Sequence, residues 1–85
     1  LNENESNEMG ITIFPNPTEN IITVENTQSF DETLTIQLMT LEGKILNTEK
    51  FNISTKFDLS EITQGVYIIK VIKGKKTRSY RVIKV

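Results

Sequence analysis

A nearly continuous apolar stretch close to the end of the sequence limits what this chain can fold into. Of the eight residues from Val66 to Lys73, six are β-branched or aromatic: Val66, Tyr67, Ile68, Ile69, Val71 and Ile72. Such side chains suit a pleated and packed surface, so the stretch predicts a β-strand. Because this strand is apolar on both faces, we expect it in the middle of a sheet or between two layers, covered by the rest of the chain.

Length and composition limit the chain to one small domain. With 85 residues and no cysteine, the fold has a modest hydrophobic core and no disulfide to support it. No apolar run approaches membrane-spanning length, and no charged-then-apolar leader opens the chain, which begins at Leu1. We therefore expect a piece of a longer protein, with no membrane-spanning segment of its own.

The first ten residues differ in composition from the rest. Residues Leu1 to Gly10 are rich in Asn and Glu and contain almost nothing to bury. Such a segment cannot offset the entropy lost on folding. We expect a disordered linker over residues 1–10 and a folded domain over residues 11–85.

The remaining sequence alternates between short apolar segments and turn residues. Leu34, Ile36 and Leu38 alternate with Thr and Gln, which is the pattern of a half-buried strand. Gly43 and Gly74 suit hairpin turns, the first of them with a bulge. We expect strands over residues 11–14, 20–25, 33–39, 44–51, 55–58, 66–72 and 77–84. This pattern, without a long helix, predicts an all-β fold, an Ig-like antiparallel β-sandwich of about seven short strands.

The segment between the fifth and sixth expected strands carries two apolar residues, Leu59 and Ile62, three positions apart. This spacing lets both side chains point into the core from one tight helical turn. Gly65 follows, and its lack of a Cβ allows an abrupt change of direction into the apolar strand.

Pro15-Asn16-Pro17 interrupts the first apolar run. The two prolines remove two backbone donors, and Pro17 pushes Asn16 away from the helical region. The tripeptide is therefore expected to form a stiff elbow that ends an edge strand, with the Asn16 amide free to bond nearby backbone.

Charge is divided along the chain, although the net charge is only −1. All 11 acidic residues precede Ile62 with three lysines, whereas every charged residue from Ile62 onward is basic. This asymmetry can steer an anionic partner towards one end of the domain. The plainer explanation, which we favour, is that basic side chains on a terminal hairpin discourage edge-to-edge pairing.

The residue types leave little for catalysis. Without histidine or cysteine, the chain lacks the commonest general base, a thiolate nucleophile and most zinc ligands. The close acidic pairs, Asp31 with Glu32 and Asp58 with Glu61, lack the alternating oxygen ligands of a calcium loop. Ser60 and Ser79 have no partner base in view, and the four glycines are too widely separated for a phosphate loop. We expect no enzymatic activity, no metal and no cofactor.

Nucleic-acid binding is a weaker possibility. Basic residues alternate with one aromatic ring over Lys75, Lys76, Arg78, Tyr80 and Arg81, as in a single-strand binder. One tyrosine is a poor stacking platform, however, and the acidic remainder of the chain opposes a polyanion. We therefore expect no nucleic-acid partner.

Four groups of residues together resemble a known family. They are Phe14-Pro15-Asn16-Pro17, Leu41-Glu42-Gly43-Lys44, Asp58-Leu59-Ser60 leading to Gly65-Val66-Tyr67, and the terminal Ile83-Lys84-Val85. In order, spacing and position they resemble the type IX secretion system C-terminal sorting domain (type A, Por secretion family), over about residues 11 to 85. The family commonly has Asp or Asn three residues before the mid-chain glycine, where this chain has Thr40.

The resemblance implies an address carried by a larger cargo protein rather than a catalyst. Members of the family are Ig-like β-sandwiches that direct a cargo, through the periplasm, across the outer membrane to the cell surface or the medium. The implied partners are the outer-membrane type IX translocon, a sortase that removes the domain, and the cargo domain that precedes it in the same chain. Cleavage is then expected in or just upstream of residues 1–10, since an accessible linker suits a protease.

The recognition candidates each have a structural explanation as well. Pro15, Asn16, Pro17, Gly43 and Gly65 suit a strand end and turns, which we favour over direct receptor contact. Tyr67 suits a core ring with its hydroxyl at the margin.

The basic candidates are Lys75, Lys76, Arg78, Arg81 and Lys84, on the terminal hairpin. Lys84 in particular suits an accessible handle. The alternative function is that of an Ig-like accessory module that binds carbohydrate or protein and stays attached to the mature protein.

Overall fold

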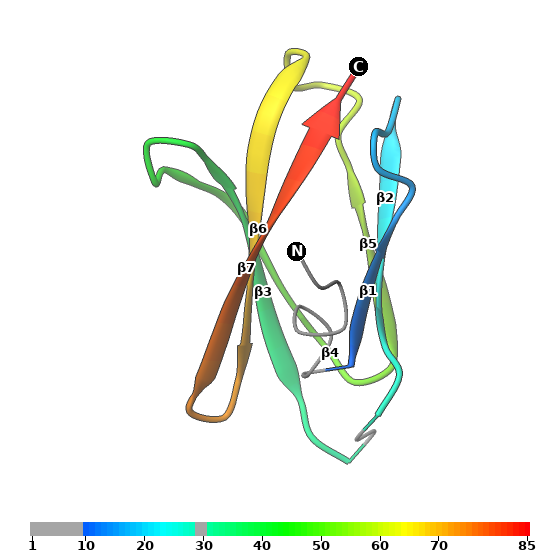
Figure 1. Cartoon of the computed structure of the whole chain (residues 1–85), viewed down its shortest axis with the longest axis vertical. Coiled ribbons are helices and arrows are strands. Elements are labelled where there is room, and N and C mark those ends of the chain that lie inside the picture. The colour runs from blue at the N-terminus through cyan, green and yellow to red at the C-terminus, as the bar shows by residue number, and fades with distance from the viewer. Residues whose placement is uncertain (1–9, 29–30) are drawn as a thin grey trace, which may run out of the picture.

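The chain forms two antiparallel β-sheets that face each other (Figure 1), in a computed structural model that describes residues 10–28 and 31–85. The strands are β1 (Ile11–Phe14), β2 (Ile21–Asn26), β3 (Leu34–Thr40), β4 (Ile45–Phe51), β5 (Ser54–Asp58), β6 (Gly65–Lys73) and β7 (Lys76–Lys84). One sheet has the order β1-β2-β5 and the other β4-β3-β6-β7. The predicted all-β sandwich is confirmed. Of the linker expected over residues 1–10, residues 1–9 lie outside the described residues.

The core lies between the two sheets and is built by alternation along each strand. In β3, Leu34, Ile36 and Leu38 are buried, as the sequence pattern predicts, while the residues between them are half-buried. The opposite sheet contributes Ile22 and Phe57, which are paired across β2 and β5. Burial of each large apolar side chain stabilises the fold by about 1.5 to 3 kcal/mol, and no disulfide adds to this.

The apolar strand β6 lies where the sequence predicts, between β3 and β7, but only one of its faces is covered. Tyr67, Ile69 and Val71 are buried, whereas Val66 and Ile68 on the other face are half-buried. The expectation that both faces are walled in is wrong, because the sandwich has two layers and this sheet turns its second face outward.

The β3–β4 turn contains the glycine conformation that the sequence predicts. Gly43 has a φ of 98°, a left-handed conformation that glycine adopts without a steric penalty. Its amide donates to the Thr40 carbonyl (3.0 Å), and the Lys44 amide donates to the Thr40 hydroxyl (3.1 Å). The predicted bulge is present as a register shift between Leu38 and Met39. The Thr40 hydroxyl thus makes a local hydrogen bond within this turn.

The turn between β5 and β6 also matches the sequence analysis. Leu59 is fully buried, Ile62 packs against the core, and the Ile62 amide donates to the Leu59 carbonyl (3.2 Å). At the other end of the chain, Gly10, the last residue of the predicted linker, is buried and accepts hydrogen bonds from the amide and the hydroxyl of Thr27. Gly10 therefore packs with the sandwich.

Candidate functional site

The segment after β1 binds the end of β7 and closes the edge of the sheet. The Asn16 side-chain amide donates to the Arg81 carbonyl (2.9 Å), and its oxygen accepts from the Ile83 amide (2.9 Å). Two residues on, the Thr18 amide donates to the Ile83 carbonyl (2.8 Å), and the Thr18 carbonyl accepts from the Val85 amide (2.9 Å). We call this contact between residues 15–18 and residues 81–85 the clasp.

Local sequence explains why the elbow takes this form. Two prolines flank Asn16 and have no amide hydrogen to donate, so the Asn16 side chain supplies the pairing groups instead. Both X-Pro peptide bonds of the elbow are cis. Thr18 is only 2% exposed, and its hydroxyl donates to the Ile21 carbonyl (2.8 Å), which closes the turn into β2. The predicted elbow at the end of an edge strand is present, but Asn16 bonds backbone 65 residues away rather than nearby backbone.

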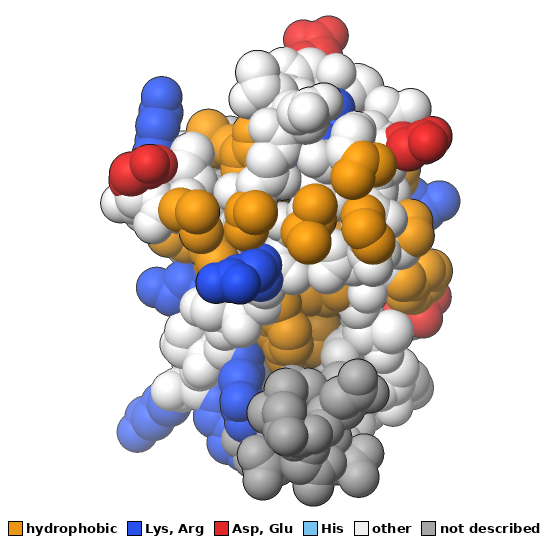
Figure 2. Space-filling model, turned by 45° about the horizontal axis from the view of Figure 1, so that its top comes forward, with side chains coloured by type: hydrophobic (Ala, Val, Ile, Leu, Met, Phe, Trp, Pro, Cys, Tyr) orange, Lys and Arg blue, Asp and Glu red, His pale blue; other side chains and the backbone are white. Residues whose placement is uncertain are grey.

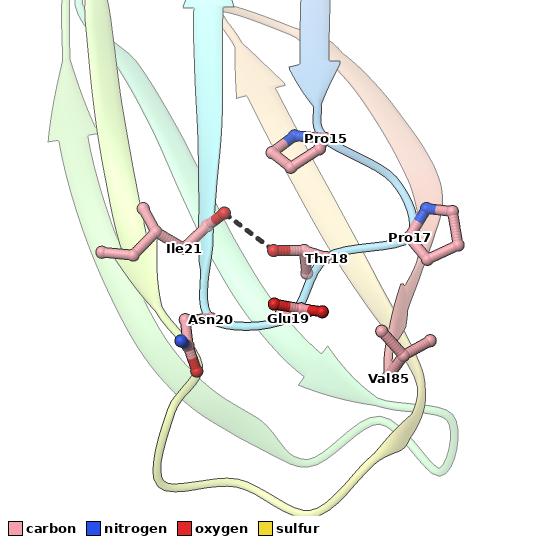
Figure 3. A pocket seen from close by; sticks show the side chains of 7 residues that line it. All are labelled: Pro15, Pro17, Thr18, Glu19, Asn20, Ile21 and Val85. Atoms are coloured by element: carbon pink, nitrogen blue, oxygen red, sulfur yellow. Dashed lines mark hydrogen bonds between the residues drawn. The ribbon is translucent and has the colours of Figure 1, made fainter.

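A pocket lies beside the clasp. It has a volume of about 690 Å³ and is lined by Pro15, Pro17, Thr18, Glu19, Asn20, Ile21 and Val85. In Figure 3, Pro17 and Val85 lie on one side of it and Ile21 and Asn20 on the other, with Thr18 and Glu19 between them. The pocket therefore combines residues that follow the first strand with the last residue of the sequence.

Exposed apolar side chains surround this end of the molecule. Val85 is 57% exposed, and Phe14, Ile21 and Ile83 are exposed as well. Figure 2 shows a row of hydrophobic side chains crossing the upper half of the visible face. Apolar surface that stays open to water at one end of a small domain is typical of a protein interaction site.

The outward face of the four-stranded sheet continues this apolar character near the clasp. Strand register places Met39 opposite both Ile45 on β4 and Ile68 on β6. It also places Val66 on β6 opposite Ile83 on β7. Val66 and Ile68 are the half-buried residues of β6 noted above, so the uncovered side of that strand belongs to this surface.

The predicted basic hairpin is not one patch. Lys75 and Lys76 lie at the β6–β7 turn, whereas Lys84 lies at the opposite end of the molecule (Figure 1), about 27 Å away at about 3.4 Å per strand residue. The Lys84 ammonium donates to the Ile62 carbonyl (3.1 Å), so this side chain holds the β5–β6 turn against β7. Arg81 is exposed next to the clasp, and Arg78 is half-buried.

The remaining sequence-predicted candidates are scattered. Gly43 is exposed in the β3–β4 turn, which lies across β6 from the clasp on β7. Gly65 is half-buried and lies opposite Lys84 in the β6–β7 register. The Tyr67 ring is in the core, 8% exposed, and its hydroxyl donates to the Thr63 carbonyl (2.7 Å). The structure thus brings together Pro15, Asn16, Pro17 and Arg81, with Lys84 and its register partner Gly65 beside them. The other candidates lie elsewhere.

Two residues of this site, Thr18 and Val85, are absent from the sequence-based set. Thr18 forms an isolated parallel bridge with Lys84, and Val85 both pairs with Thr18 and lines the pocket. No local pattern signals these contacts, because they join segments from opposite ends of the chain.

Acidic residues do not form a metal site in the part of the chain that the structure describes. No group of three or more His, Cys, Asp or Glu residues within 10–28 and 31–85 is placed to hold an ion. Asp58 is instead used locally, since its carboxylate accepts a hydrogen bond from the Ser60 amide (2.9 Å). Hydrogen bonds from the Ser60 hydroxyl and amide hold the pKa of Asp58 below its ordinary value.

This lowered pKa of Asp58 predicts a small acid sensitivity. A carboxylate with a depressed pKa in the folded state contributes stability above its unfolded pKa of about 3.9, and the contribution is lost as the pH falls through the folded pKa. When the pH is lowered from 7 to below the Asp58 pKa, the melting temperature should therefore fall less for the Asp58→Asn variant than for the parent protein. Identical losses in the two proteins would show that the Ser60 hydrogen bonds do not stabilise the charged form.

A family model described as the secretion system C-terminal sorting domain matches residues 12–85. The chain belongs to this family. The match contains every strand of the sorting domain except the first residue of β1, and it contains both halves of the clasp.

The family is that of type IX secretion C-terminal sorting signals. A search of the curated proteins finds no match to the chain. Among the described residues of the sorting domain, no helix is long and apolar enough to cross a membrane.

Proposed function

We propose that this sorting domain directs a larger cargo protein across the outer membrane through the type IX translocon, and that a sortase then removes it. The observation that carries the proposal is the family match over residues 12–85, which spans the whole clasped sandwich. Cleavage falls in or just before residues 1–10, and the cargo reaches the cell surface or the medium by way of the periplasm. The domain itself is non-catalytic.

The recognition surface that we propose is the clasp end of the sandwich. It comprises Pro15, Asn16, Pro17 and Arg81 with the adjoining pocket and the exposed Val85. Because its two halves are 65 residues apart in the chain, this surface exists only when the domain is folded. A partner that binds it therefore distinguishes a folded sorting domain from an unfolded one.

Removal of the last strand tests the proposal. A periplasmic reporter fused to residues 1–85 should appear at the surface or in the medium of a host that has the translocon. The same fusion cut after Lys75 lacks β7, its nine-residue pairing with β6 and one half of the clasp, so it should stay in the periplasm. Fractionation with an activity assay for the reporter measures this, and full export of the truncated fusion would refute the proposal.

The mature C-terminus distinguishes a sorting signal from an accessory module. Mass spectrometry of the exported cargo should find a C-terminus within or upstream of residues 1–10. A mature cargo that retains residues 11–85 would instead indicate a binding module that stays attached.

A further inference from the structure

The clasp shows which backbone groups of β7 face away from β6. The Arg81 carbonyl and the amide and carbonyl of Ile83 bond to Asn16 and Thr18, which are not part of the sheet. In a strand, the amide and carbonyl of one residue point to the same side, and successive residues alternate. The next residues whose backbone points away from β6 are therefore Ser79 and Thr77.

At Ser79 and Thr77 the edge of β7 is open among the described residues. β6 occupies the other side of the strand in continuous register, and the clasp reaches only residues 81–85. Both side chains are exposed. An unpaired row of amides and carbonyls is a template for an added strand.

The opposite edge of the same sheet is less suited to strand addition. On β4, the Asn47 side chain accepts a hydrogen bond from the Thr48 amide (2.8 Å) and occupies that donor. The β3–β4 register shift between Leu38 and Met39 also makes this edge irregular. Such features discourage pairing with another chain, so β7 is the edge of this sheet at which a strand can add.

Positive charge surrounds the open edge. Lys75 and Lys76 precede Thr77 and are exposed, and Arg81 follows Ser79 and is exposed. Glu32, whose carboxylate lies near Gly74, is the acidic side chain that the structure shows at this turn. Basic residues before and after the open edge favour an acidic strand over a neutral or basic one.

We propose that the open edge of β7, at Thr77 and Ser79, binds an extended acidic segment of a protein partner as an additional strand. The added strand would continue the pairing that Asn16 and Thr18 begin on the same edge. Lys75, Lys76 and Arg81 would lie close to its carboxylates. This inference rests on the proposed function in one respect, namely that the partner takes part in sorting.

A peptide titration tests the inference without any secretion machinery. The full chain, residues 1–85, labelled with ¹⁵N, is titrated with a short synthetic peptide of alternating Val and Glu. The amides of Thr77, Ser79 and Arg81 should shift and become protected from hydrogen exchange. A peptide with Lys in place of Glu should not bind, and binding of the acidic peptide should weaken as salt is added.

Matched variants separate backbone pairing from side-chain contact. Ser79→Pro removes an outward-facing amide and should weaken peptide binding about tenfold or more, which corresponds to about 1.4 kcal/mol, whereas Ser79→Ala should bind as the parent does. If Ser79→Pro fails to fold, the exposed pair Lys76→Glu and Arg81→Glu should abolish binding of the acidic peptide.

Three results would overturn the inference. The first is that the acidic peptide shifts only amides of other strands. The second is that a single-stranded DNA oligonucleotide binds as tightly as the acidic peptide. The third is that the amides of Thr77 and Ser79 are protected in the free chain and lose this protection when residues 1–9 are deleted. The last result would make the acidic segment of this chain the occupant. None of these three results concerns export of the reporter. Failure of the strand-addition inference can therefore be distinguished from failure of the proposed function.

Discussion

Replacing Ile69 with alanine is expected to lower the free energy of unfolding by about 2 to 5 kcal/mol. Ile69 is fully buried in the middle of β6, between Leu38 on β3 and Tyr80 on β7. Its truncation removes apolar burial and leaves a cavity where all three strands meet. Since small domains have a total stability of about 5 to 15 kcal/mol, this one change threatens the whole fold. Urea denaturation followed by circular dichroism measures the loss.

The adjacent residue provides the matched control for Ile69. Ile68 has the same side chain on the same strand but belongs to the half-buried outward face. The Ile68→Ala variant should therefore cost about 1 kcal/mol, within the ordinary range for partly exposed positions. Equal losses for the two variants would contradict the assignment of the faces of β6.

Replacing Asn16 with alanine is expected to open the clasp and to cost about 1 to 3 kcal/mol of stability. The variant loses one hydrogen bond to the Arg81 carbonyl and one from the Ile83 amide, each worth about 0.5 to 1.5 kcal/mol. Hydrogen exchange is the informative measurement, because the Ile83 amide loses its partner. That amide should exchange faster in the variant, while the amides of β3 should keep protection up to the global stability.

Two further substitutions isolate the role of the Asn16 side chain. Asn20→Ala changes an exposed asparagine that lines the same pocket, and it should leave the Ile83 exchange rate unchanged. Asn16→Asp keeps an oxygen that accepts from the Ile83 amide but no longer donates to Arg81, so its effect should be intermediate. If Asn16→Ala and Asn20→Ala behave alike, the clasp does not hold β7.

Much of the sandwich is predictable from the sequence because its signals are local. The alternation of Leu34, Ile36 and Leu38 with polar residues identifies β3 and its buried face. Gly43 and Gly74 mark hairpin turns, and the spacing of Leu59 and Ile62 predicts the turn before β6. Each of these patterns depends on residues within a few positions of one another.

The clasp is not predictable in this way because it joins the two ends of the chain. The sequence indicates a stiff elbow at Asn16 but not its partners, since the hydrogen bonds to Arg81 and Ile83 depend on how the sheets pack. The spread of the basic candidates along β7 has a similar reason. Residues close in sequence on an extended strand separate by more than 3 Å per position, so Lys76 and Lys84 lie at opposite ends of β7.

The apolar composition of β6 predicts burial on both faces, and the structure buries only one. Apolar residues at Val66 and Ile68 indicate burial, yet a two-layer sandwich has only one inner face for each sheet. Their half-buried position, in register with Met39 and Ile83, instead extends the apolar surface near the clasp. Val66 and Ile68 lie outside the core, and their apolar side chains therefore fit a surface that binds a partner.

We infer that the export machinery recognises the clasped end of the folded domain. The most direct test is the export of a periplasmic reporter fused to the Asn16→Ala domain, beside a buried-core variant such as Ile69→Val chosen for equal stability. Fractionation should find less of the Asn16→Ala fusion in the medium than of the core variant. Equal export of the two fusions would show that stability alone matters and would contradict the claim.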